Sequence, residues 1–213
     1  MGGELMAYGE RAWLLRGVED ADRFSIGAAL AKEPPLHFEE YVLGHSSILL
    51  IFAQPVAKTI LEGWLSKADF GKRGKAKNSK LHKVPVIYDG PDLAFVAEAT
   101  GRSVEEVIKI HSEGKYSVRM IGFTPGFPYL EGLDPRLQID RRNTPRNRIE
   151  PGTVAIGGPH AGIYTVASPG GWNLLGRTNL NFFQADQCKG AKIDTGKIFR
   201  LKPGDQVQFV PQK

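Results

Sequence analysis

Glycine and proline recur at short intervals in the second half of this 213-residue sequence. Their spacing limits the folds that the chain can adopt, because it leaves room only for short regular segments. From residue 116 onward, short apolar segments alternate with turns that contain Gly or Pro, such as Pro203-Gly204-Asp205. Short strands separated by such turns are typical of a small barrel or sandwich. We therefore expect a β-rich second domain over residues 89–213.

The first part of the chain alternates segments typical of strands and of helices instead. We expect strands over residues 10–18, 37–43, 47–53 and 81–88, and helices over residues 21–32 and 55–65. Pro55 opens the second helix, where its missing N–H does no harm. The order β-α-β-β-α-β is that of a ferredoxin-like unit. The sequence therefore predicts an α+β chain whose first domain spans residues 1–88.

Two short helices are predicted between these regions. The first starts at Asp92 and ends before Gly101, a residue type that favours the left-handed position after a helix. Ser103 and Glu106 form a capping box at the start of the second helix. His111 falls in the last turn of that helix, where the helix dipole favours a protonated imidazole.

Composition excludes several classes of protein. The chain is 41% hydrophobic and 24% charged, which is typical of a soluble globular protein. No apolar run approaches the roughly 18 residues of a membrane helix, and no signal peptide is visible. The single cysteine, Cys188, cannot form an internal disulfide. We expect a cytoplasmic protein with no membrane partner.

Much of the net charge of +5 comes from residues 72–83. Such a basic segment could bind nucleic acid or another polyanion. It contains no interleaved aromatic residues on which bases could stack. We favour its interpretation as a solvated connector and expect no nucleic-acid partner.

Two segments that combine glycine, proline and aromatic residues are the candidate ligand loops. Rigid loops of this kind on a scaffold commonly carry function, although tight turns whose rings fill a core would look the same. The candidate pocket residues are Phe123, Thr124, Pro125, Gly126, Phe127, Tyr129, Ser168, Pro169, Gly170, Gly171 and Trp172.

Several standard catalytic signatures are absent from the sequence: a P-loop, a Gly-x-Ser-x-Gly elbow and metal-ligand spacing. What remains is a group of arginines, whose guanidinium groups suit carboxylate or phosphate recognition. They are Arg136, Arg141, Arg142, Arg146, Arg148 and Arg177, with surface charge as the alternative interpretation. His111 is a candidate general acid or base, or else a cap or a packed ring. The residues alone predict a glycine-rich pocket that favours anions, without naming a reaction.

The same residues carry a family resemblance over nearly the whole chain. The matching motifs are Tyr8-Gly9-Glu10-Arg11-Ala12, Val84-Pro85-Val86-Ile87-Tyr88-Asp89-Gly90-Pro91-Asp92-Leu93, His111, Gly122-Phe123-Thr124-Pro125-Gly126-Phe127-Pro128-Tyr129-Leu130, Gly132-Leu133, Thr144-Pro145-Arg146, Gly162-Ile163-Tyr164, Ser168-Pro169-Gly170-Gly171-Trp172 and Pro203-Gly204-Asp205. With them the chain resembles the family of 5-oxoprolinase B-type subunits, also called KipI-like or allophanate hydrolase subunit 1.

The resemblance implies a ferredoxin-like domain followed by a cyclophilin-like β-barrel. It further implies a complex with a KipA-like C-type subunit and an A-type subunit, which opens 5-oxo-L-proline to L-glutamate with ATP as co-substrate. Mg²⁺ could accompany the ATP, and the isolated chain is expected to be inactive. On this interpretation His111 and Arg146 are the candidate catalytic residues.

Other functions stay open at this point. Relatives include an inhibitor of a sporulation histidine kinase, so a kinase is an alternative partner. Related modules also occur in enzymes of the urea carboxylase and allophanate hydrolase type. A prolyl isomerase is suggested by the cyclophilin-like fold alone, and fold does not imply function.

Overall fold

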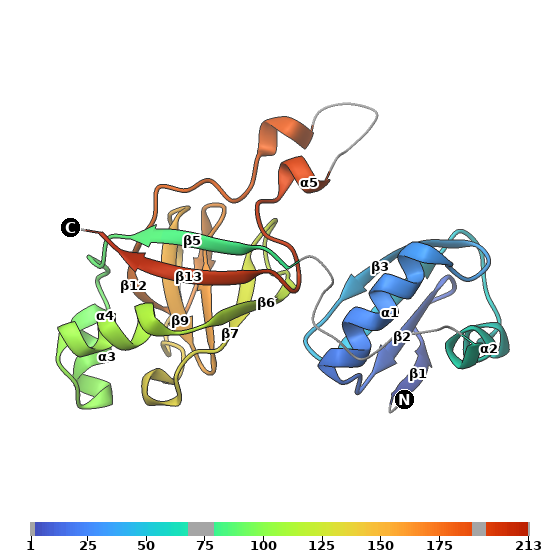
Figure 1. Cartoon of the computed structure of the whole chain (residues 1–213), viewed down its shortest axis with the longest axis horizontal. Coiled ribbons are helices and arrows are strands. Elements are labelled where there is room, and N and C mark those ends of the chain that lie inside the picture. Colours follow the sequence, from blue (N-terminus) through green and yellow to red (C-terminus); the bar gives the residue numbers. More distant parts are fainter. Residues whose placement is uncertain (1–2, 68–78, 189–194, 213) are drawn as a thin grey trace. The chain divides into compact units, whose positions relative to one another are not determined.

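The computed structural model describes residues 3–67, 79–188 and 195–212. The chain divides into two compact units, Met1–Asn78 and Ser79–Lys213, each with its own core (Figure 1). The boundary therefore falls before the expected one at residue 88. Most of the basic segment 72–83 lies outside the described residues, so its role as a connector stays a prediction.

Unit 1 is a four-stranded antiparallel sheet with two helices. Its elements are β1 (Glu4–Ala7), β2 (Ala12–Arg16), α1 (Asp20–Lys32), β3 (Phe38–Leu43), β4 (Ser47–Phe52) and α2 (Lys58–Lys67). The strand order is β1-β2-β4-β3. Every second residue of β4 is buried, and these side chains pack with Ile26 and Leu30 of α1. Helix α1 thus covers one face of the sheet (Figure 1).

The ferredoxin-like expectation is wrong for its last strand. The strand expected over 81–88 forms as β5 (Leu81–Val86), but it belongs to the sheet of unit 2. The edge position beside β2 is taken by β1, which pairs with β2 as a hairpin. Only four residues join β1 to β2 in sequence, so this pairing closes a very short loop.

Unit 2 is built around a seven-stranded sheet. Its remaining elements are α3 (Leu93–Thr100), α4 (Val104–Glu113), β6 (Tyr116–Ile121), β7 (Pro128–Glu131), the 3-10 turn Pro135–Leu137, β8 (Arg146–Ile149), β9 (Thr153–Gly157), β10 (His160–Ile163), β11 (Ser168–Gly170), β12 (Asn173–Arg177), the 3-10 turn Ala185–Cys188, α5 (Thr195–Ile198) and β13 (Gln206–Pro211). The order is β12-β9-β10-β7-β6-β13-β5, and β8 pairs separately with β11.

The two edges of the seven-stranded sheet meet. Just beyond β5, Ile87 exchanges two backbone hydrogen bonds of 2.9 Å with Arg177 at the end of β12. The sheet is therefore nearly closed into a barrel, which leaves few exposed strand edges. The expected α+β class and barrel-like second unit are confirmed in this form, whereas the finer expectation of a cyclophilin-like barrel stays a prediction.

Helices α3 and α4 of unit 2 begin and end at the residues expected from the sequence. The Ser103 hydroxyl accepts from the Glu106 N–H and the Glu106 carboxylate accepts from the Ser103 N–H, which confirms the capping box. Gly101 ends α3 with a φ of 64°. Asp92 occupies the N-cap of α3, but its side chain does not cap the helix and instead bonds elsewhere. Helix α4 packs against β13 (Figure 1).

No helix among the described residues is long and apolar enough to cross a membrane. The thiol of Cys188 is free and exposed.

Candidate functional site

The two candidate loops meet in an aromatic cluster of unit 2. The rings of Phe127 and Trp172 lie 5.4 Å apart, edge to face, and Tyr129 and Tyr164 contact the Phe127 ring in the same way. Edge-to-face pairs of this kind add specificity to the packing of a cluster. Phe127 and Trp172 are both buried, so these two rings fill a core, as the alternative interpretation of the two loops expects.

The outer part of the first loop is shaped differently. Phe123 has a φ of 66° and is 57% exposed. A non-glycine residue in this region of φ is uncommon and strained, and such strain clusters at functional sites. The turn is held by the Phe127 N–H bonding to the Thr124 carbonyl and by the Thr165 hydroxyl bonding to the Pro125 carbonyl. The structure therefore holds one aromatic ring in solvent above a buried cluster.

A buried carboxylate organises the arginines beside this cluster. Asp92 is almost fully buried, and its Oδ1 accepts from Arg142 at 3.0 Å and from Arg146 at 2.7 Å. Its Oδ2 accepts from the backbone N–H of Leu174 at 2.8 Å. The Nη1 of Arg146 is also buried and has no hydrogen-bond partner in the described part of the chain. One nitrogen of the Arg146 guanidinium is therefore held by Asp92, while the buried Nη1 keeps a donor that no described residue uses.

The backbone brings this guanidinium to the second loop. Arg146 of β8 pairs with Gly170 of β11, where a Cβ atom would overlap the hydroxyl of Tyr164. Burial raises the pKa of Tyr164, and a hydrogen bond from the Trp172 backbone and the charges of Arg141 and Arg146 oppose that rise. Glycine at position 170 thus leaves room for the Tyr164 hydroxyl beside the strand pair that carries Arg146.

A hollow of about 380 Å³ lies next to this group. It is lined by Phe95, Ile139, Asp140, Arg141, Arg142, Asn143, Thr144 and Asn173. Asn173 is fully buried, its Nδ2 donates to the Asp140 carbonyl at 3.0 Å, and its Oδ1 has no partner among the described residues. Arg141 also lies over the Trp172 ring. The arrangement can bind a small anionic group beside an aromatic wall.

His111 lies in a different cluster. Its ring is fully buried, stacks on Phe209 at 4.5 Å and bonds through Nδ1 to the hydroxyl of Tyr88 at 2.8 Å. Burial lowers the pKa of His111 to about 3. The expectation of a protonated imidazole is therefore wrong, because loss of water outweighs the helix dipole. The alternative interpretation as a packed ring describes this residue.

The remaining arginines have surface roles. Arg136, Arg148 and Arg177 form ion pairs with Asp134, Glu150 and Asp89 in which each arginine is more than half exposed. For these three, the alternative interpretation as surface charge holds. Sequence reasoning missed the roles of Asp92 and Asn173 in the site, although Asp92 lies within the run 84–93 that carries part of the family resemblance.

Comparisons with known proteins place these features in a family. Residues 4–192 match the family described as carboxyltransferase domain, subdomain C and D. The chain is 38% identical over 182 residues to the B-type subunit of 5-oxoprolinase from Escherichia coli O157:H7, covering 82% of this chain and 78% of that protein. It is 33% identical over 120 residues to urea amidolyase of Saccharomyces cerevisiae, covering 55% of this chain but 6% of that protein.

A solved structure has the same fold. The crystal structure of TTHA0988 superposes with a TM-score of 0.78 at 31% identity, covering 95% of this chain. The match covers 40% of the TTHA0988 chain, so this chain corresponds to less than half of that protein.

The role of Asp92 can be tested by replacing it with alanine. We expect Asp92→Ala to lower the free energy of unfolding by about 3 kcal/mol, because it leaves a partly buried guanidinium without its counter-ion. Urea denaturation followed by circular dichroism measures the loss. Asp89→Ala is the matched control, since the Asp89–Arg177 pair is exposed and should be worth less than about 1 kcal/mol. Equal losses of unfolding free energy in the two variants would contradict the role of Asp92 as the buried counter-ion of Arg142 and Arg146.

Burial of His111 predicts a pH dependence of stability. The unfolded chain protonates this histidine near pH 6.5 and the folded chain near pH 3, so the unfolded state binds more protons in that window. The contribution of His111 is therefore fully present above about pH 6.5 and is lost as the pH falls. Between pH 7 and pH 5 the wild type should lose about 2 kcal/mol more than His111→Gln, measured by denaturation at each pH. Parallel losses in both proteins would show that His111 is not buried as described.

Proposed function

Because the chain belongs to the family of 5-oxoprolinase B-type subunits, we propose that it is one component of an ATP-dependent enzyme that converts 5-oxo-L-proline to L-glutamate. The observation that carries this proposal is the 38% identity to the Escherichia coli protein, which spans most of both chains. The partners would be a KipA-like C-type subunit and an A-type subunit.

The chemistry of such a reaction matches the donors in unit 2. A lactam resists hydrolysis, and transfer of the γ-phosphoryl group of ATP to its oxygen, with release of ADP, would make the ring carbon open to attack by water. The C–N bond of the tetrahedral intermediate would then break to give an open-chain acyl phosphate, which a second water would hydrolyse to glutamate and phosphate. Negative charge then develops on oxygen atoms that need fixed donors. The buried Nη1 of Arg146 is a donor of this kind, held in place from its other side by Asp92. We assign the backbone at Gly170 and Gly171 to the same oxygen or phosphate contacts.

The aromatic cluster would shield the ring of the substrate. Phe123, Phe127, Tyr129 and Trp172 supply an apolar wall beside the arginines. Exclusion of water strengthens the electrostatic contacts of a site. His111 is left out of this machinery, because its ring is fully buried in another cluster and its lowered pKa makes it a poor proton carrier near neutral pH.

ATP enters this proposal as a co-substrate of the assembled complex, with Mg²⁺ as its usual companion. The sequence has no P-loop, so the nucleotide site would be completed by another protein of the complex. The chain on its own is then expected to be inactive.

Co-expression tests the proposal directly. The chain is produced with its A-type and KipA-like partners, and glutamate release from 5-oxo-L-proline is measured with and without ATP. We expect glutamate that depends both on ATP and on this chain. A well-folded complex that releases none would overturn the proposal.

A second candidate follows from the 33% identity to urea amidolyase. The same complex of three proteins would then consume urea in an ATP-dependent reaction. Urea consumption without glutamate formation would favour this function.

The role assigned to Arg146 has its own test. In the active complex, Arg146→Ala should lower kcat/KM at least about 10-fold, the equivalent of about 1.4 kcal/mol of transition-state stabilisation. Arg148→Ala is the matched control, because Arg148 lies two residues away on β8 and pairs with Glu150 at the surface. It should leave kcat/KM unchanged. Wild-type activity in a folded Arg146→Ala complex would remove Arg146 from the mechanism.

A further inference from the structure

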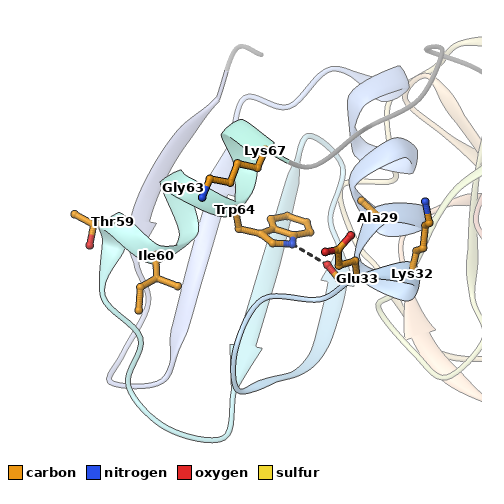
Figure 2. A pocket seen from close by; sticks show the side chains of 8 residues that line it. All are labelled: Ala29, Lys32, Glu33, Thr59, Ile60, Gly63, Trp64 and Lys67. Atoms are coloured by element: carbon orange, nitrogen blue, oxygen red, sulfur yellow. Dashed lines mark hydrogen bonds between the residues drawn. The ribbon is translucent and has the colours of Figure 1, made fainter.

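Unit 1 contains a groove that the proposed chemistry does not use. It lies between the C-terminal part of α1 and one side of α2 and has a volume of about 420 Å³ (Figure 2). Its lining residues are Ala29, Lys32 and Glu33 from the end of α1 and Thr59, Ile60, Gly63, Trp64 and Lys67 from α2. Two helices thus form the walls of a single groove.

The wall that α2 contributes includes two large apolar side chains, Ile60 and Trp64. Ile60 is 45% exposed, although it is a large aliphatic side chain. The Nε1 of Trp64 donates to the carbonyl of Glu33 at 2.8 Å, so the polar edge of the indole is already satisfied within unit 1 (Figure 2). Trp64 also lines the groove. Tryptophan is among the residues most often found as anchors of protein interfaces.

Gly63 keeps the groove open. It lies inside α2, where glycine costs about 0.5–1 kcal/mol of helix stability relative to alanine. Among the described residues, no atom beyond its chain neighbours and the backbone of its own helix lies within 4 Å of the position that its Cβ would take. The described part of unit 1 therefore gives no packing reason for a glycine there. With Ala29 on the opposite wall, Gly63 allows a third helix to approach closely, since interhelical distances depend on the side chains at the contact.

The charges around the groove are mainly positive. Lys32 and Lys67 line it from the two helices, and Glu33 is the acidic residue among the described residues of the lining (Figure 2). On the same helix, Lys58 pairs with Glu62 and is not part of the lining. Rim charges of this kind select partners of opposite charge and speed association.

We propose that this groove receives an amphipathic helix from another protein of the complex, with its apolar face on Ile60 and Trp64 and acidic side chains toward Lys32 and Lys67. Binding of a helix in a groove between helices is a common mode of recognition. This inference rests on the proposed function only in that the helix is sought among the A-type and KipA-like partners.

Filling the groove tests the inference. Gly63→Leu places a bulky side chain in the open space, and leucine is a better helix former than glycine, so α2 should remain folded. We expect at least a roughly 10-fold rise in the Kd for the purified A-type and KipA-like proteins, measured by isothermal titration calorimetry. Gly63→Ala is the matched control, because it adds helix propensity with little bulk and should bind within about 3-fold of wild type.

Reversing the charges provides an independent test. The double variant Lys32→Glu, Lys67→Glu should weaken binding at least about 10-fold and more strongly at low salt, because screening weakens attraction between exposed charges. Lys58→Glu changes a charge on α2 outside the groove and should bind as wild type does. Circular dichroism checks that each variant is folded.

The outcomes separate this inference from the proposed function. If Gly63→Leu and the double lysine variant bind the two proteins as wild type does, the groove is not the docking site, whether or not the complex makes glutamate. If both lose binding while the wild-type complex makes no glutamate, the docking site stands and the proposed function fails. A wild-type chain that binds neither protein overturns the inference.

Discussion

The carboxylate of Asp92 is almost fully buried, and both of its oxygens accept hydrogen bonds from groups far away in the sequence. A buried carboxylate without such partners would cost several kcal/mol. These bonds connect the start of α3 to Arg142, to Arg146 on β8 and to Leu174 on β12. The candidate site therefore depends on one charge, since the same residue that occupies the N-cap of α3 also orients the guanidinium group of Arg146.

The two units have separate cores, and we propose a separate role for each unit: catalysis for unit 2 and docking for unit 1. Unit 2 closes its sheet through the hydrogen bonds between Ile87 and Arg177, and it carries the aromatic cluster and the arginines on this rigid frame. Functional sites need such frames, because misplaced donors lose most of their effect. Unit 1 carries a groove with exposed Ile60 and an open space at Gly63. Catalysis in one unit and docking in the other would explain why a member of an enzyme complex needs both.

Local signals in the sequence predicted much of this structure. The capping box at Ser103 and Glu106 and the end of α3 at Gly101 form where expected, and the strand expected over residues 81–88 forms over Leu81–Val86. The sheet that contains this strand could not be predicted, because its partner β13 lies more than a hundred residues away. His111 shows the same limit, since the end of a helix favours its charged form but burial against Phe209 decides the outcome.

By itself, the sequence determined where α3 and α4 begin and end and which residue types could meet an anion. It was wrong for the start of α2, which begins at Lys58 and not at Pro55. Caps and turns depend on residues a few positions apart, so these features can be read from short segments. Only the tertiary structure decided that Asp92 holds Arg146 and that Arg148, two residues further along the same strand, faces solvent. Burial and long-range hydrogen bonds separate a site residue from a surface charge, and both arise only when distant segments pack together.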